Sequence, residues 1–248
     1  MALIALIAGG FGFLLRRQEV ATIFDPHSGL ALRGAPISIA LIAFSLVVVA
    51  LLLGLSFTVS KQQLPTFADA FDGGIPLAIL RAILGLVVLA LAGQELLPIA
   101  QSDELDPFSA IQLGAALLAG LCLTLMAILT PGGTNVAIPS TIPVFWLCTW
   151  LIISHIDRAA DPVLLGYAYN LFALAALLLA LYYIAGYAFR QSHPRRLMFC
   201  SSAAVYFTGV TVGDDLSFYT RGTLLALAAT VLIYQLILTR NLLQRGLQ

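Results

Sequence analysis

The sequence predicts an all-α, polytopic membrane protein, a bundle of about eight transmembrane helices forming one domain over residues 1–248. Of its residues, 60% are hydrophobic and only 10% are charged, whereas an ordinary soluble domain carries roughly 25% charged residues. Apolar runs long enough for a helix to cross a hydrocarbon core recur along the chain. The connections between these runs are too short to hold a soluble domain.

The predicted spans follow one another through the whole chain. The first is short, and its basic residues, Arg16 and Arg17, follow the apolar run instead of preceding it, which is not typical of a signal peptide. We expect a helix there, with the two arginines snorkelling or lining the bundle near its end. The predicted spans cover residues 2–15, 36–60, 75–99, 107–130, 137–156, 162–188, 197–213 and 217–239.

The centre of the chain carries no charge at all between Asp106 and Asp157. Two spans fit into this stretch, joined by residues 131–143, where prolines and glycines interrupt the helix. Turn residues such as Asp72-Gly73-Gly74 mark other connections. The number of spans falls to seven if the 131–143 region is re-entrant or if segment 2–15 does not cross.

The basic residues indicate the orientation only weakly. Lys and Arg collect on the cytoplasmic side of membrane proteins. With eight spans and both termini inside, seven basic residues lie on the inner side and five on the outer side. We therefore expect a protein of the plasma (inner) membrane with cytoplasmic termini. The inner residues in this arrangement are Lys61, Arg81, Arg190, Arg195, Arg196, Arg240 and Arg245.

Polar side chains within the predicted spans are candidates for a solute or ion pathway. A charged residue at a helix centre costs about 2.5–3.5 kcal/mol on insertion scales. Arg81 and Glu95 share one span and one face, and Gln94 lies beside Glu95. These residues either line a polar pathway or snorkel to the two interfaces. Asn170 lies within another span, where it either bonds a neighbouring helix or contacts a ligand.

A second group of candidates lies in the link before the last span. Asp214 and Asp215 are adjacent acids, and Arg221 follows them. Aspartate is a preferred N-cap residue and stabilises the first helical turn. The group therefore predicts either a structural role, as a helix cap or in a salt bridge to Arg221, or part of an ion or substrate site.

Several functional classes are excluded or disfavoured. Twelve basic and twelve acidic residues cancel, which leaves no basic face for nucleic acid. The sequence contains no HExxH, GxSxG, P-loop or dinucleotide motif, so we expect no enzyme, no catalytic residue and no cofactor. The cysteines are too widely spaced for a metal or disulfide framework; they are Cys122, Cys148 and Cys200.

Two hypotheses for function remain. The first is a small-solute transporter, or a membrane subunit of a transport system, because isolated intramembrane polar groups and a Gly/Pro-broken element typify midplane sites. The alternative is a non-transporting scaffold or sensor that binds a partner membrane protein through small-residue faces. Candidates for such faces are Gly114 with Gly120, and Ala173, Ala175, Ala176 and Ala180. The lipid bilayer is the partner common to both hypotheses.

Overall fold

The computed structural model describes residues 1–23, 35–59, 64, 66–101, 107–157 and 167–246, and every structural statement below refers to these residues. The described structure is 86% helical and contains no strand, as the sequence predicts. Its helices, in chain order, are α1 (Ala2–Ile23), α2 (Pro36–Ser56), α3 (Phe67–Phe71), α4 (Ile75–Gln101), α5 (Pro107–Leu129), α6 (Ala137–Asp157), α7 (Ala168–Ala188), α8 (Pro194–Thr211) and α9 (Phe218–Gly246).

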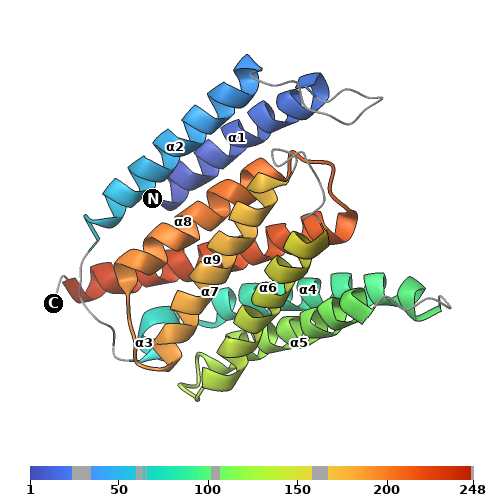
Figure 1. Cartoon of the computed structure of the whole chain (residues 1–248). Helices are drawn as coiled ribbons and strands as arrows, with labels where there is room; N and C mark the ends of the chain where they lie inside the picture. Colours follow the sequence, from blue (N-terminus) through green and yellow to red (C-terminus); the bar gives the residue numbers. More distant parts are fainter. Residues whose placement is uncertain (24–34, 60–63, 65, 102–106, 158–166, 247–248) are drawn as a thin grey trace.

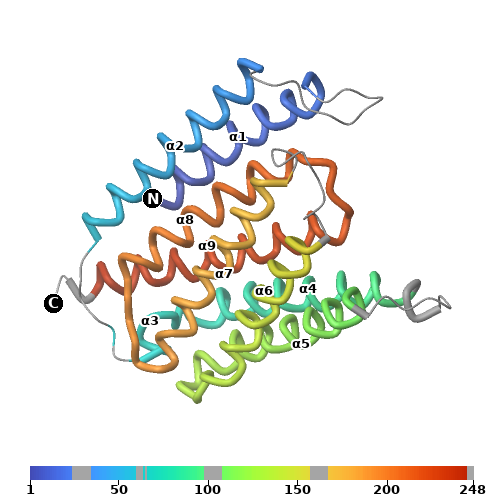
Figure 2. Tube along the Cα trace, viewed as in Figure 1, coloured from blue at the N-terminus to red at the C-terminus, as the bar shows by residue number. Residues whose placement is uncertain are grey.

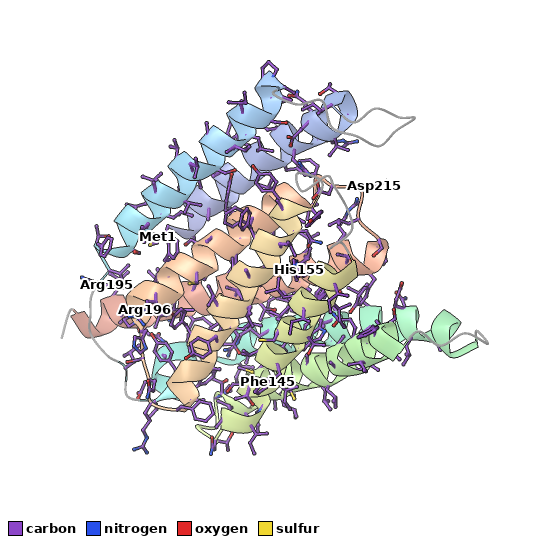
Figure 3. All side chains as sticks on the ribbon, in the orientation of Figure 1. Met1, Phe145, His155, Arg195, Arg196 and Asp215 are labelled. Atoms are coloured by element: carbon purple, nitrogen blue, oxygen red, sulfur yellow. The ribbon has the colours of Figure 1, made fainter. Side chains whose placement is uncertain are left out.

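The long helices alternate in direction and end at two opposite faces of the bundle (Figures 1 and 2). We call the face that holds both the start of α1 and the end of α9 the terminal face, and the other the distal face. Figure 3 places Met1, Arg195 and Arg196 at the terminal face and Asp215 at the distal face. Helices consecutive in the chain pack against each other from α4 through α9, and α1 packs on α2 and α8.

Six of the described helices are long and apolar enough to cross a membrane: α2, α4, α5, α6, α7 and α9. Large apolar side chains also face outward, as Leu3, Ile7 and Phe11 of α1 do at 54–68% exposure. These features fit contact with lipid, because no water-soluble surface would carry them so densely. The chain is thus an integral membrane protein with a multi-helix apolar architecture, while the count of eight spans stays a prediction.

The two remaining long helices, α1 and α8, are less apolar for reasons that the fold explains. The second half of α1 carries Arg16, Arg17 and Glu19. Helix α8 lies inside the bundle, in contact with α1, α2, α7 and α9, and its serines Ser201 and Ser202 are fully buried. Polar side chains are tolerated there because other helices, and not lipid, surround them.

The segment at residues 131–143 is a short turn followed by a helix. Helix α5 ends at Leu129 and α6 begins at Ala137, so the interruption covers only seven residues. Pro139 lies in the first turn of α6, where proline is tolerated, and Pro143 lies inside the helix. Both flanking helices are long enough to cross a membrane, which argues against the re-entrant alternative.

Helices α4 and α5 approach each other closely at two glycines. A methyl group added at Gly120 would lie 2.7 Å from the backbone nitrogen of Leu89, and one at Gly85 would lie 2.7 Å from the backbone nitrogen of Thr124. The small-residue face at Gly120 is therefore used within the chain. The alanines Ala173, Ala176 and Ala180 are likewise buried inside the bundle. Ala175 is half-buried and Gly114 has open space around it, so a face for a partner stays a prediction.

The variant Gly120→Ala is expected to lower the unfolding temperature, because backbone atoms of α4 must move to admit the methyl group. Overpacking of this kind costs about 1–3 kcal/mol. In Gly114→Ala the added methyl group meets no atom within 4 Å, so the gain in helix propensity of up to about 1 kcal/mol dominates. Thermal unfolding of both variants in one detergent checks this, and equal shifts would contradict the assigned α4–α5 contact.

Candidate functional site

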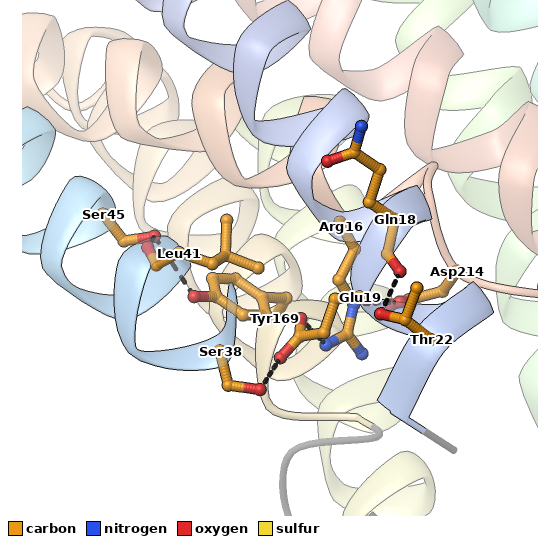
Figure 4. Close-up of polar contacts among 9 residues, drawn as sticks. All are labelled: Arg16, Gln18, Glu19, Thr22, Ser38, Leu41, Ser45, Tyr169 and Asp214. Carbon is orange, nitrogen blue, oxygen red and sulfur yellow. Dashed lines mark hydrogen bonds and ion pairs between the residues drawn. The ribbon is translucent and has the colours of Figure 1, made fainter. Parts of the chain in front are cut away.

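A cluster of buried charges lies between α1, α2 and the end of α8. Arg16 and Glu19 are one helical turn apart on α1, and Asp214 follows α8 (Figure 4). Their exposed fractions are 1%, 2% and 7%. The Arg16 Nε donates to Asp214 Oδ1, and the Arg16 Nη1 donates to Glu19 Oε2 at 2.7 Å. We call these three residues the charge cluster.

Hydroxyl groups extend this site into the bundle. Ser38 of α2 donates to Glu19 Oε1, and the guanidinium carbon of Arg16 lies 5.4 Å from the ring centre of Tyr169. The Tyr169 hydroxyl lies 3.2 Å from Ser45 Oγ, which lies 2.8 Å from the Tyr206 hydroxyl. These three buried hydroxyls, from α7, α2 and α8, form a continuous hydrogen-bonded chain.

Among the three described residues of the cluster, the carboxylates outnumber the guanidinium. Two carboxylates share one guanidinium, so the cluster carries a net negative charge when all three groups are ionised. A charge that is left uncompensated in a low-dielectric interior is costly. Binding one proton or one monovalent cation removes the excess.

A pocket of about 470 Å³ gives access to the cluster from the distal face. Asp214 and Asp215 line it, together with Arg17 and Arg221. Arg221 Nη2 also donates to the backbone oxygen of Asp214 at 3.1 Å. The three residues predicted from the link before the last span are thus brought together, with Asp214 buried and Asp215 exposed.

Further polar side chains follow the contact between α8 and α9 toward the terminal face. Gln235 Nε2 donates to Ser202 Oγ at 2.8 Å, and both residues are fully buried. Thr208 and Thr211 lie between this pair and Asp214 along α8, and neither hydroxyl has a hydrogen-bond partner in the described part of the chain. The interior of the bundle is therefore polar along much of α8.

The polar residues predicted within the spans lie in separate places. Arg81 is 1% exposed and lies over the ring of Tyr234 of α9, with 4.8 Å between its guanidinium carbon and the ring centre. Gln94 and Glu95, near the distal end of the same helix, are exposed. Asn170 is buried near the start of α7, and its Oδ1 has no partner among the described residues.

These residues do not converge on one cavity. Among the described residues, neither the pocket beside Asp214 nor two further pockets, one between α1, α8 and α9 and one beside α3, is lined by Arg81, Glu95 or Asn170. Arg81 lies near the terminal face and the other two near the distal face, since fourteen residues of α-helix separate Arg81 from Glu95 by about 21 Å. The shared-pathway arrangement is therefore not observed, and each residue stays a separate candidate.

Sequence analysis missed the main partners in the charge cluster. Glu19, Ser38 and Tyr169 were not among its candidates, and Arg16 was expected only to snorkel or line the bundle. One signal was present, because Arg16 and Glu19 stand three residues apart and so share a helix face. The other partner, Asp214, is 198 residues away in the chain, and no local pattern connects it to α1.

Comparison of the chain with protein-family models, with curated proteins and with solved structures gave no match. The feature with the clearest chemical meaning is the charge cluster, because ionisable residues inside a helix bundle pair with one another and mark ion pathways and proton relays.

Proposed function

We propose that the chain is a small-solute transporter, or the membrane subunit of a transport system, in which the charge cluster binds the coupling ion. The observation that carries this proposal is the sharing of one buried guanidinium, from Arg16, by two buried carboxylates, from Glu19 and Asp214. Occupation by a proton or a monovalent cation neutralises the cluster. Release of that ion restores the excess charge and its cost, so the two states differ in free energy, as coupling requires.

The proposed topology has eight spans, in which α1 and α8 also cross the membrane, packed against neighbouring helices. Assigned by sequence position in this topology, seven basic and two acidic residues belong to the terminal side, and five basic and ten acidic residues to the distal side. The excess of basic residues favours a cytoplasmic terminal face. The pocket beside Asp214 then opens outward, in the plasma membrane that we propose for the chain.

The polar groups on both sides of the cluster support a route for the ion. The distal pocket leads from the outer solution to Asp214. Beyond the cluster, the hydroxyl chain from Tyr169 to Tyr206 and the Ser202–Gln235 pair lead inward. Hydroxyl and amide groups of this kind act as proton relays and as weak cation ligands, which a coupled transporter needs in a dry interior.

Glu19→Gln is expected to reduce ion-dependent charge movement at least tenfold, because the variant removes the excess carboxylate while keeping its shape and an oxygen that accepts from Ser38. The measurement needs no known solute. The full chain is reconstituted in proteoliposomes on a solid-supported membrane, and transient currents are recorded after a jump in pH or in Na⁺. Wild-type protein is expected to give a saturable transient current.

The matched control is Asp72→Asn, the same loss of a carboxylate charge at an exposed acid that is neither in the cluster nor among the candidate pathway residues. Its currents are expected to equal those of the wild type. If neither jump moves charge in the wild type, or if Glu19→Gln responds like the control, the cluster is not a coupling site.

The second candidate function is a non-transporting scaffold or sensor for a partner membrane protein. A groove of about 440 Å³ between α1, α8 and α9 favours it, because its lining is almost entirely apolar and rich in small residues such as Gly9, Gly10 and Gly209. Such grooves allow close approach of another helix. Purification in mild detergent with an equimolar second polypeptide, together with the absence of ion-dependent currents, would favour this candidate over transport.

A further inference from the structure

A second polar pocket lies at the terminal face, on the opposite side of the bundle from the charge cluster. It has a volume of about 400 Å³ and lies between α3, the turn that joins α5 to α6, and the end of α7 (Figure 1). We call it the terminal pocket. The lining residues used below are Thr66, Thr134, Asn135, Tyr187 and Arg190.

The hydroxyl of Tyr187 is the first indication of a ligand. Tyr187 is 2% exposed, and its ring packs against Phe71 of α3 with 4.9 Å between ring centres. Its hydroxyl oxygen is buried and has no hydrogen-bond partner among the residues that the structure describes. Buried hydroxyls are seldom left unpaired, since a lost hydrogen bond to water is not replaced. A group bound in the terminal pocket would complete the hydrogen bonding of Tyr187.

The orientation of the other polar groups determines what kind of ligand fits. Asn135 Oδ1 accepts from the backbone nitrogen of Ala137 at 2.9 Å, so its amide nitrogen remains available to donate. The hydroxyl of Thr134 already donates to Leu129 O at 2.9 Å, and that of Thr66 donates to Asp69 Oδ2 at 2.6 Å. Asn135 and Tyr187 therefore offer donors to the pocket.

The terminal pocket also has a positively charged residue in its lining. Arg190 brings a guanidinium, with its donors in a planar fork that matches carboxylate and phosphate oxygens. None of the described residues that line the pocket is acidic. The neighbouring chain is also basic, with Arg195 and Arg196 at the same face (Figure 3). Among the described residues, the carboxylate bonded to a lining residue is that of Asp69, which accepts from Thr66 Oγ1 at 2.6 Å, so the case for an anion rests on the guanidinium of Arg190.

We infer that the terminal pocket binds a phosphate group, either free inorganic phosphate or the phosphate of an anionic lipid headgroup. Residues that carry donors line the pocket from three separate elements, namely Asn135 of the α5–α6 turn, Tyr187 of α7 and Arg190 beyond α7. A tetrahedral phosphate has oxygens pointing in several directions and satisfies such a set better than a planar carboxylate. The inference is independent of the charge cluster and of ion coupling.

The charge of Arg190 can be removed without changing its backbone conformation. Its φ is 59°, a left-handed conformation that glycine and asparagine adopt most readily at the end of a helix. Arg190→Asn therefore removes the charge without adding backbone strain. Tyr187→Phe removes only the hydroxyl and keeps the ring against Phe71. Tyr182→Phe makes the same change at an exposed tyrosine on α7 and is the control.

The experiment uses the full chain in nanodiscs of phosphatidylcholine. Inorganic phosphate and a short-chain phosphatidylglycerol are titrated separately by isothermal calorimetry. We expect saturable binding of at least one probe, weakened about fivefold or more by Tyr187→Phe and about tenfold by Arg190→Asn, as loss of one neutral and one charge-assisted hydrogen bond implies. Tyr182→Phe is expected to bind as the wild type does.

The two probes distinguish the source of the phosphate. Saturation by inorganic phosphate indicates a free anion, and saturation by phosphatidylglycerol alone indicates a lipid headgroup. The inference is overturned if neither probe saturates the wild type, or if Tyr187→Phe and Arg190→Asn both bind within twofold of it. Thermal unfolding of each variant, run alongside, confirms that the protein titrated is folded.

Discussion

Replacing Arg16 by methionine is expected to destabilise the bundle by about 3–5 kcal/mol, because the variant leaves Glu19 and Asp214 buried without their shared cation. Breaking a buried ion pair by removing one partner has this cost, whereas removing all the charges together does not. The unfolding temperature in mild detergent measures the effect. Arg17→Met, at the exposed neighbouring position, is the control and is expected to shift stability by less than about 0.5 kcal/mol.

Two further substitutions test the physical reason. Adding Glu19→Gln and Asp214→Asn to Arg16→Met removes the remaining charges and is expected to recover most of the lost stability. Non-additivity of this kind is the signature of residues in one network. If Arg16→Met unfolds at the same temperature as Arg17→Met, or if the neutral triple variant is no more stable than Arg16→Met alone, the charge cluster is not the network described.

Replacing Arg81 by methionine is expected to act in the opposite direction and stabilise the protein by about 1–4 kcal/mol. All three guanidinium nitrogens of Arg81 are buried and have no hydrogen-bond partner among the described residues. Arg81 lies over the ring of Tyr234, and a cation–π contact returns only about 2 kcal/mol when desolvated. A hydrophobic side chain of similar length avoids the cost of burying a charge.

The control for this prediction is Arg81→Lys, which keeps the charge and should give no gain in stability. Thermal unfolding of the two variants in the same detergent makes the comparison. Loss of stability in Arg81→Met would show that Arg81 has a partner that its described surroundings do not provide. A gain in stability with a loss of transport would identify Arg81 as a residue retained for function at a cost in stability.

The helical class and most helix positions could be predicted from local composition. The span predicted at 107–130 corresponds to α5, Pro107–Leu129, and that at 137–156 corresponds to α6, Ala137–Asp157. The reason is that crossing a bilayer demands a continuous apolar run of fixed length with its backbone bonds satisfied internally. Proline and glycine between two such runs are enough to locate the turn.

The first helix shows where this local reasoning stops. The predicted span ended at residue 15, whereas α1 continues to Ile23. The helix extends because Arg16 and Glu19 pair on its buried face and a third charge, Asp214, approaches from the link between α8 and α9. A charge ends an apolar run in the sequence, but it does not end a helix when the fold neutralises it.

The candidate site depended on tertiary structure still more. Asp214, Asp215 and Arg221 could be singled out because charges close together in a short link are rare in so apolar a chain. Their connection to Arg16 and Glu19 could not, since it follows from the packing of α1 against α8. The same holds for Gly120, whose small size predicted a face for a partner, and which the fold places against α4.

Sequence alone therefore establishes what the bilayer imposes on each segment separately, namely helices, their approximate lengths and the turns between them. Packing decides which of the rare polar side chains face one another, because that depends on helix rotation and crossing, and neither property leaves a local pattern. The charge cluster and the terminal pocket both belong to this second kind. Each joins residues from helices that are distant in the chain, and each becomes visible only when those helices are placed side by side.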